Sequence, residues 1–151
     1  MPHPRKITFL ITDLLLGGAP RWLRDLALGL VPHASRIDVI SIKPLPPASL
    51  PGEGLSIPQQ LSAAGIGVHT LNVSTPLHFA AAPFRLARLL NSLQPDILYS
   101  VLLHANALAT LALPLLSPRP AFIQSLHALQ DKPAWHWTLQ GLIAPFCDAL
   151  I

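Results

Sequence analysis

Two histidines follow apolar stretches that are typical of buried strands, where an imidazole can hydrogen-bond a hydroxyl or a phosphate. His127 follows the stretch 120–126, and His104, which comes shortly after Ser100, begins a segment that also holds Asn106. The alternative for each histidine is a structural role, with its ring nitrogens satisfied inside the fold. Neither has a second ligand at close spacing or a carboxylate partner, so we expect no metal site.

A third candidate is the pair Gly17-Gly18, which follows the apolar run 7–11 and precedes a helix with Pro20 in its first turn. Glycines allow backbone conformations and close approaches that a Cβ would block. A helix N-terminus behind them offers free N–H groups and the positive end of the helix dipole, which together suit an anion. A plain strand-to-helix turn is the alternative interpretation of this pair.

The hydrophobic periodicity predicts the elements that must position these residues. Helices are expected after Pro20 and over residues 58–64, 83–93, 104–116 and 134–145; strands are expected over 7–11, 36–42, 67–73, 95–100, 120–126 and 148–151. This alternation predicts an α/β fold, with one Rossmann-like parallel sheet and helices on both faces, over a single domain 1–151. Because domain ends usually lie in exposed linkers, an end inside a strand leads us to expect a fragment.

Polar residues gather at the expected carboxyl ends of these strands, where ligands bind in open α/β sheets. They are Thr12, Asp13, Gly17, Gly18, Ser74, Thr75, Ser100, His104, Ser125 and His127. Loops are polar in most proteins, so this grouping supports a binding edge without identifying its ligand.

Several common sites are disfavoured by the motifs that they would need. The turn Gly17-Gly18-Ala19-Pro20 is not the G-x-G-x-x-G of a dinucleotide site, and the second strand ends at Lys43 instead of an acidic residue. The sequence also lacks a P-loop and a G-x-S-x-G nucleophile elbow. NADP-dependent oxidoreductases, P-loop nucleotidases and α/β-hydrolases are therefore disfavoured, although Lys43 could meet a 2′-phosphate.

Composition narrows the class further. The 151 residues are 51% hydrophobic and 11% charged, which favours an ordered domain with a large core over a disordered chain. The net charge of +3 comes without a Lys/Arg run, so we expect no nucleic-acid partner. Cys147 is the single cysteine, which excludes an internal disulfide and fits a reducing compartment. Trp135 and Trp137 are assigned to packing rather than to ligand stacking.

The order of several short segments resembles the N-terminal domain of retaining glycosyltransferases with the two-domain GT-B fold, in the family 4-like group. The resemblance covers nearly the whole chain. The matching segments are Thr12-Asp13-Leu14 leading to Gly17-Gly18-Ala19, the stretch 88–100, the start His104-Ala105-Asn106 and the run Ser125-Leu126-His127-Ala128.

The resemblance implies a role for each matching residue. The loop of Gly17, Gly18 and Ala19 would approach the diphosphate of a nucleotide-sugar donor. His127 would be the catalytic histidine near the donor sugar, hydrogen-bonding in the transition state as the leaving phosphate departs. The acceptor, a saccharide or a lipid-linked sugar, would be lined by Ser100, His104 and Asn106. No cofactor or metal is expected, because the nucleotide-sugar is a substrate.

Two departures from the family pattern concern this site. Pro20 stands where the family often has Glu after Gly-Gly-Ala, which removes a carboxylate and one N–H from the donor loop. Many members have His where Tyr99 or Ser100 stands. The C-terminal domain, which in the family makes most donor contacts, is absent from this chain, so we expect the chain alone not to turn over.

The resulting functional hypothesis is the acceptor-side domain of a retaining, hexosyltransferase-type enzyme of polysaccharide biosynthesis. Its expected location is the cytoplasm, at the inner face of the membrane, with peripheral membrane contact toward a lipid-linked acceptor. The alternative is a non-catalytic α/β module that binds a small phosphorylated or glycosylated ligand, or a partner protein.

Overall fold

Strand β1 (Arg5–Ile11) lies in the middle of a six-stranded sheet and is buried on both faces. The computed structural model describes residues 5–48, 54–126 and 135–151. Phe9 and Ile11 belong to the core on one face of the sheet, whereas Leu10 belongs to the core on the other. A strand buried on both sides needs a nearly continuous apolar run, and this requirement explains the sequence of β1.

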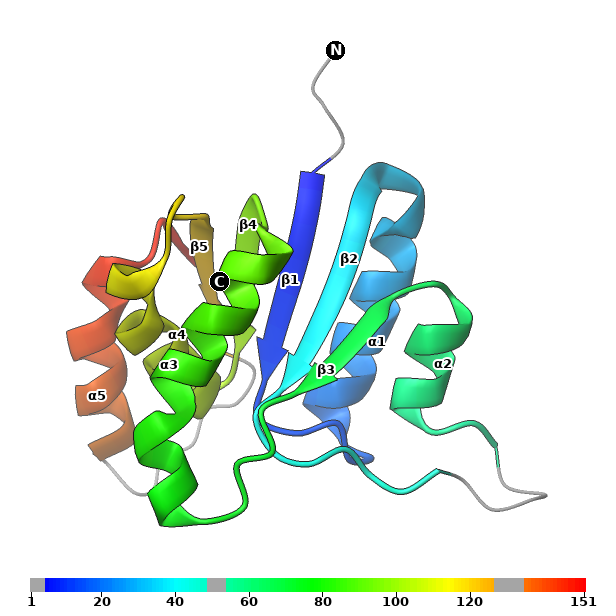
Figure 1. Ribbon diagram of the computed structural model, residues 1–151, viewed down its shortest axis with the longest axis horizontal. Helices are drawn as coiled ribbons and strands as arrows, with labels where there is room; N and C mark the ends of the chain where they lie inside the picture. The colour runs from blue at the N-terminus through cyan, green and yellow to red at the C-terminus, as the bar shows by residue number, and fades with distance from the viewer. Residues whose placement is uncertain (1–4, 49–53, 127–134) are drawn as a thin grey trace.

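The described strands are all parallel and follow the order β3-β2-β1-β4-β5-β6 (Figure 1). Beyond β1 they are β2 (Ala34–Ser41), β3 (Gly67–Thr70), β4 (Ile97–Val101), β5 (Ala121–Ser125) and β6 (Ala149–Leu150). The chain builds outward from β1 through β2 and β3, then returns to the other side of β1 with β4. This reversal makes the gap between β1 and β4 the topological switch point of the sheet.

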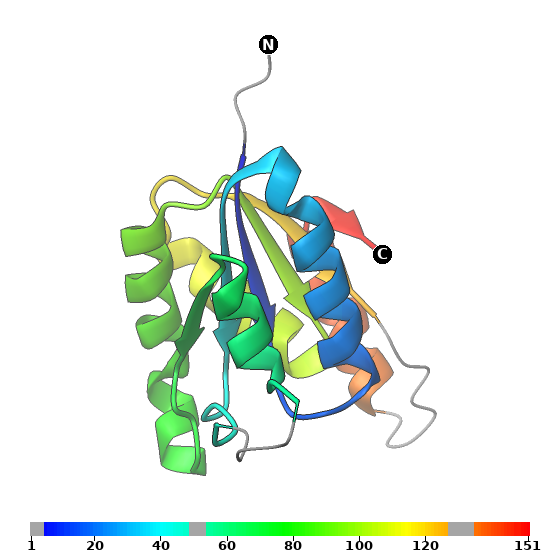
Figure 2. The same cartoon turned by 90° about the vertical axis from the view of Figure 1, so that its right-hand side faces the viewer.

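Helices cover both faces of the sheet, as predicted. Figure 2 shows α1 and α3 on opposite sides of it. Helices α1 (Gly18–Leu30) and α2 (Ile57–Ala63) pack on one face, and α3 (Pro76–Leu93), α4 (Leu103–Ala112) and α5 (Trp135–Ile143) lie on the other. Short 3-10 turns follow α1, α4 and α5 at Val31–His33, Leu113–Leu115 and Ala144–Phe146. The α/β, Rossmann-like prediction is confirmed.

Helix α3 differs most from the sequence expectation, because it begins at Pro76 instead of Pro83. The Thr75 hydroxyl caps the helix by accepting a hydrogen bond from the His78 backbone N–H at 3.3 Å. Pro76 fits the first turn, where a missing N–H leaves no bond unmade. Pro83 therefore lies inside the helix, where it removes one backbone hydrogen bond. Both prolines are plausible helix starts, and the threonine cap decides between them.

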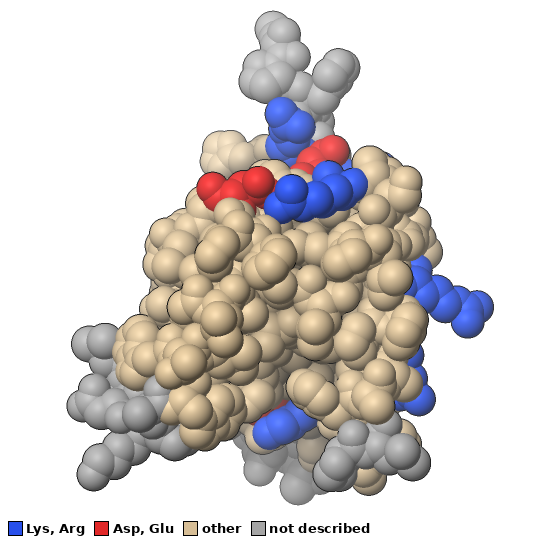
Figure 3. All heavy atoms as spheres, turned by 90° about the vertical axis from the view of Figure 1, so that its left-hand side faces the viewer, with Lys and Arg blue, Asp and Glu red and all other residues tan. Residues whose placement is uncertain are grey.

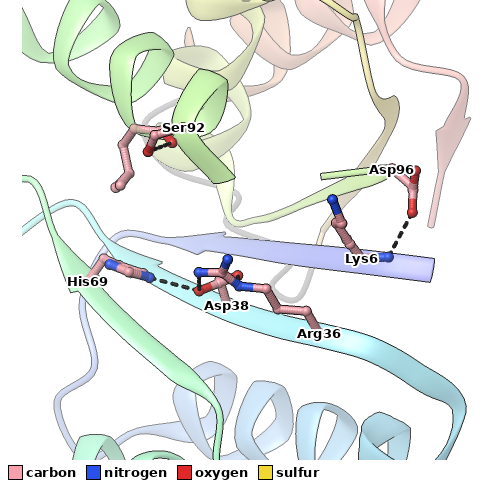
Figure 4. A network of polar contacts seen from close by, with 7 residues as sticks. Lys6, Arg36, Asp38, His69, Ser92 and Asp96 are labelled. Carbon is pink, nitrogen blue, oxygen red and sulfur yellow. Dashed lines mark hydrogen bonds and ion pairs between the residues drawn. The ribbon is translucent and has the colours of Figure 1, made fainter. Parts of the chain in front are cut away.

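A charged cluster lies between β2 and β3, under α3 (Figure 4). The Asp38 carboxylate is 2% exposed. It pairs with the Arg36 guanidinium at 2.7 Å and with the His69 Nε2 at 2.8 Å. A Cβ at Gly67 would collide with this carboxylate, so glycine is required at that position. The cluster joins the edge strand β3 to β2.

Candidate ligand-binding edge

The β1–α1 turn places the N-terminus of α1 at the switch point. Gly17 is the N-cap, and the Arg21 backbone N–H bonds the Gly17 carbonyl at 3.2 Å. Gly17 has no side chain that could accept from the first turn, and neither Gly18 nor Ala19 carries a compensating negative charge. The positive end of the helix dipole at Gly18 and Ala19 is therefore open to an anion.

The reason expected for the glycine pair needs correction. Gly17 has an extended backbone, with φ −169° and ψ 175°, which any residue can adopt. A Cβ at Gly17 would meet Pro20 at an ordinary 3.6 Å, and one at Gly18 would meet nothing within 4 Å. The fold itself does not demand these glycines. What they provide is empty space beside the helix N-terminus, where a ligand could approach the backbone.

An ion pair lies beside this turn. The Asp13 carboxylate is 3.5 Å from the Lys43 ammonium, and it also accepts the Leu15 backbone N–H at 3.3 Å, which shapes the loop. Lys43 follows β2, and its backbone N–H bonds the Thr12 carbonyl at 2.9 Å. The Thr12 hydroxyl oxygen is buried and has no hydrogen-bond partner among the described residues. The edge thus holds an ion pair and a buried hydroxyl that makes no hydrogen bond to the described residues.

The β4–α4 connection is strained at Leu102. Its φ of 76° and ψ of 156° lie in a region that side chains rarely adopt, at a cost of about 1–3 kcal/mol. Two hydrogen bonds hold it there. The Leu102 N–H donates to the Ser125 carbonyl at 3.2 Å, and the Leu102 carbonyl accepts from the Asn106 N–H at 2.9 Å. This strained residue directs the first turn of α4, including His104, to the edge.

His104 meets a second histidine there. The ring centroids of His104 and His136 are 6.1 Å apart, and Trp135 packs edge-on against His136 at 4.1 Å. Burial lowers the pKa of His104, and the positive charges of His136 and Lys43 lower that pKa further. The neutral imidazole is therefore favoured, and it offers one N–H donor and one acceptor nitrogen. Nδ1 of His136 is buried without a partner among the residues described.

The other predicted site residues fall into two groups. Ser100 and Asn106 are fully buried, and the Ser100 hydroxyl donates to the Asn106 side-chain oxygen at 2.6 Å. In this structure they do not line an acceptor surface, because neither side chain reaches solvent. Their hydrogen bond lies inside the fold and joins β4 to α4. His127 lies outside the described residues.

Two residues at this edge were not assigned to it from sequence. The sequence places Lys43 after the second expected strand, next to the first in a parallel sheet, but does not show its pairing with Asp13. His136 stands between Trp135 and Trp137, and its local sequence does not predict the contact with His104. No local pattern shows that the start of α5 meets the start of α4.

Three open hollows formed by described residues border α3, with volumes of about 350, 380 and 520 Å³. The largest is lined by His78, Ala80, Ala81, Phe84 and Arg85. We place the candidate site at the strand edge, because titratable side chains and an open helix N-terminus converge there. Within the described ranges, no group of three or more His, Cys, Asp or Glu side chains gathers to hold a metal. The absence of a metal requirement stays a prediction.

Comparison with known proteins identifies the family. Residues 16–151 match Glycosyltransferase Family 4. A solved glycosyltransferase from Rickettsia africae ESF-5 has the same fold, with a TM-score of 0.63 and 14% sequence identity. The match covers 90% of this chain and 33% of that one, so the chain spans about a third of the solved enzyme. No curated protein matches. The chain belongs to glycosyltransferase family 4, and its fold is that of the Rossmann-like N-terminal domain of a GT-B enzyme.

Proposed function

We propose that this chain is the acceptor-side domain of a glycosyltransferase that moves a sugar from a nucleotide-sugar donor to a saccharide or lipid-linked acceptor. One observation supports this most strongly: the open N-terminus of α1 and the neutral-favoured His104 converge on the carboxyl ends of the central strands. A phosphate-bearing ligand and a hydroxyl-bearing ligand could therefore meet at one edge.

The proposed chemistry divides between the two features. As the bond between sugar and diphosphate breaks, negative charge grows on the leaving oxygen. The N–H groups of Gly18 and Ala19 are pre-oriented to stabilise that charge. Neutral His104 would hydrogen-bond the acceptor hydroxyl, and His127 would serve the reaction centre, as the family resemblance implies. Retention of configuration and transfer of a hexose are parts of the proposal that rest on the resemblance alone.

The test is release of nucleoside diphosphate by the complete protein, offered a panel of UDP-, GDP- and ADP-sugars. We expect one donor to give release, and we expect His127→Ala and His104→Ala to lower it strongly. We expect residues 1–151 alone to release none, because the family resemblance implies that most donor contacts come from the second domain of a GT-B enzyme. Binding of a nucleotide sugar without release by the complete protein would favour the non-catalytic module instead.

A matched pair of variants tests the helix N-terminus itself. Gly18→Asp places a carboxylate where the diphosphate is proposed to bind, and nothing lies within 4 Å to obstruct the new side chain. Gly29→Asp adds the same charge near the opposite end of the same helix, also into open space. We expect the first to raise the KM for the donor about tenfold or more, which is about 1.4 kcal/mol of lost binding. Equal effects of the two variants would remove the diphosphate from this helix end.

Peripheral membrane contact at the inner, cytoplasmic face also belongs to the proposal. No helix among the described residues is long and apolar enough to cross a membrane. Residues 97–118 and 133–147 contain no Asp, Glu, Lys or Arg. Figure 3 shows the resulting face over α4 and α5, with charged side chains confined to its borders. Its exposed apolar residues include Leu111, Leu142 and Phe146. The border carries charges of both signs, so the apolar face itself supports the proposed contact with a bilayer.

Co-sedimentation with vesicles of phosphatidylcholine and phosphatidylglycerol at low salt tests this contact. We expect the complete protein to pellet and Leu142→Glu to reduce pelleting. Leu55→Glu is the control, because Leu55 is similarly exposed, at 56% against 66%, but lies beside α2 across the sheet. A protein that stays in the supernatant would rule the membrane contact out.

A further inference from the structure

A chain of buried side-chain amides runs beneath the candidate edge. The Asn106 side-chain nitrogen donates to the Gln140 Oε1 at 3.1 Å, and the Gln140 nitrogen donates to the Gln124 Oε1 at 2.6 Å. Gln124 then donates to the Ile143 carbonyl at 3.2 Å, and Ser100 donates to Asn106 at the other end of the chain. These bonds tie β4, α4, α5 and β5 together.

These side chains are buried, so each of their polar atoms needs a hydrogen-bond partner within the protein. Ser100, Asn106 and Gln124 are 0% exposed, and Gln140 is 4% exposed. A buried amide is tolerated only when its donors and acceptors find partners of the right kind at the right distance. Apolar side chains could slide past one another along the α4–α5 contact, whereas an amide chain with fixed donors and acceptors permits one arrangement. The amides therefore set how α5 lies against α4.

The same bonds control the histidine pair at the edge. Gln140 lies four residues after His136, so both project from the same face of α5. Asn106 lies in the first turn of α4 with His104, and its backbone N–H also holds the strained Leu102. The 3.1 Å bond between Asn106 and Gln140 thus joins the first turn of α4 to the turn of α5 that follows His136.

We infer that Asn106 and Gln140 are positioning residues, whose buried amide contact holds His136 against His104 at the ligand edge. The inference concerns the geometry of the edge and stands whichever ligand binds there. It also gives the buried residues Ser100 and Asn106 a role other than acceptor contact: they help to fix the helix starts that carry the two imidazoles.

The test is an NMR titration of the ring protons of His104 and His136 in wild type and in Gln140→Met, which keeps a similar volume and loses both amide bonds. Among the described residues, the charged groups around His104 are His136 on α5, Lys43 after β2 and Asp13, which pairs with Lys43. We expect Gln140→Met to lose the contact between the two rings, seen as a nuclear Overhauser effect. We also expect the pKa of His104 to rise toward its ordinary value, because burial and the charge of His136 are both relieved.

Ile143→Val is the control for a purely structural effect. It shortens a buried apolar side chain of the same helix, which lowers stability, and it keeps every amide side chain as well as the Ile143 backbone carbonyl to which Gln124 donates. We expect a lower Tm and an unchanged titration of His104. If Gln140→Met does not fold, Ser100→Ala takes its place, because it removes one donor of the amide chain and adds no volume. The same two changes are expected: loss of the contact between the rings and a rise in the pKa of His104. An unchanged His104 titration in the amide variant, or an equal shift in Ile143→Val, would overturn the inference.

Discussion

At the scale of single residues, the site depends on side chains whose states are set by their neighbours. His104 is the clearest example, because its pKa is lowered first by burial and then by the positive charges of His136 and Lys43. A neutral imidazole can both donate to and accept from a substrate hydroxyl. The sequence could nominate His104 from its place after a strand, but it could not supply the neighbours that determine its protonation.

The lowered pKa makes the stability of the fold depend on pH with a defined sign. A histidine whose folded-state pKa lies below its unfolded value of about 6.5 binds fewer protons in the folded state. Such a histidine lowers the free energy of unfolding, and this effect is absent well above pH 6.5 and grows as the pH falls through that value. We expect His104→Gln to lose less thermal stability than wild type between pH 7.5 and pH 5.5. Parallel Tm profiles for the two proteins would contradict the lowered pKa.

At the scale of elements, the sequence predicted which segments are strands more reliably than where helices start. Strands such as β1 and β2 carry apolar runs that only a sheet covered on both faces requires. Helix α3 was placed too late because Pro83 and Pro76 are both acceptable first-turn residues. The packing of α5 against α4 could not be predicted from the sequence, because it depends on buried amides that meet only in the folded chain.

The internal proline of α3 yields a prediction at this scale. Pro83→Ala restores an N–H inside the helix and should stabilise the fold by about 1–3 kcal/mol. Pro58→Ala is the matched control, because Pro58 lies in the first turn of α2 after the N-cap Ser56, where its missing N–H leaves no bond unmade. The control should be neutral or slightly destabilising, since it frees the unfolded chain. Urea denaturation measures both; equal effects would show that Pro83 does not interrupt α3.

At the scale of the whole molecule, the candidate ligand edge and the charged cluster between β2 and β3 have different roles. The carboxyl ends hold the open helix N-terminus, the Asp13–Lys43 pair and the histidines. The cluster of Asp38, Arg36 and His69 lies elsewhere and holds the edge strand β3 in place. We therefore expect changes at this cluster to affect stability without changing ligand binding.

Two glycine variants test the role of this cluster. Gly67→Ala drives a methyl group into the Asp38 carboxylate and should destabilise the fold by about 1–3 kcal/mol, as overpacking does in other cores. Gly29→Ala adds a methyl group that meets no other atom within 4 Å, and it should stabilise helix α1 by about 0.5–1 kcal/mol. Both are measured by urea denaturation. A neutral Gly67→Ala would mean that β3 tolerates displacement from β2.

The central claim is that the carboxyl edge between β1 and β4 binds the substrates of a glycosyltransferase. Hydrogen exchange of the complete protein, with and without the nucleotide-sugar donor that supports diphosphate release, measures this directly. We predict that donor slows exchange in the segment 12–21, and that donor and acceptor together also slow it in 102–106. Protection confined to the opposite edge, around residues 31–35 and 94–96, or no protection between residues 5 and 126, would contradict the account.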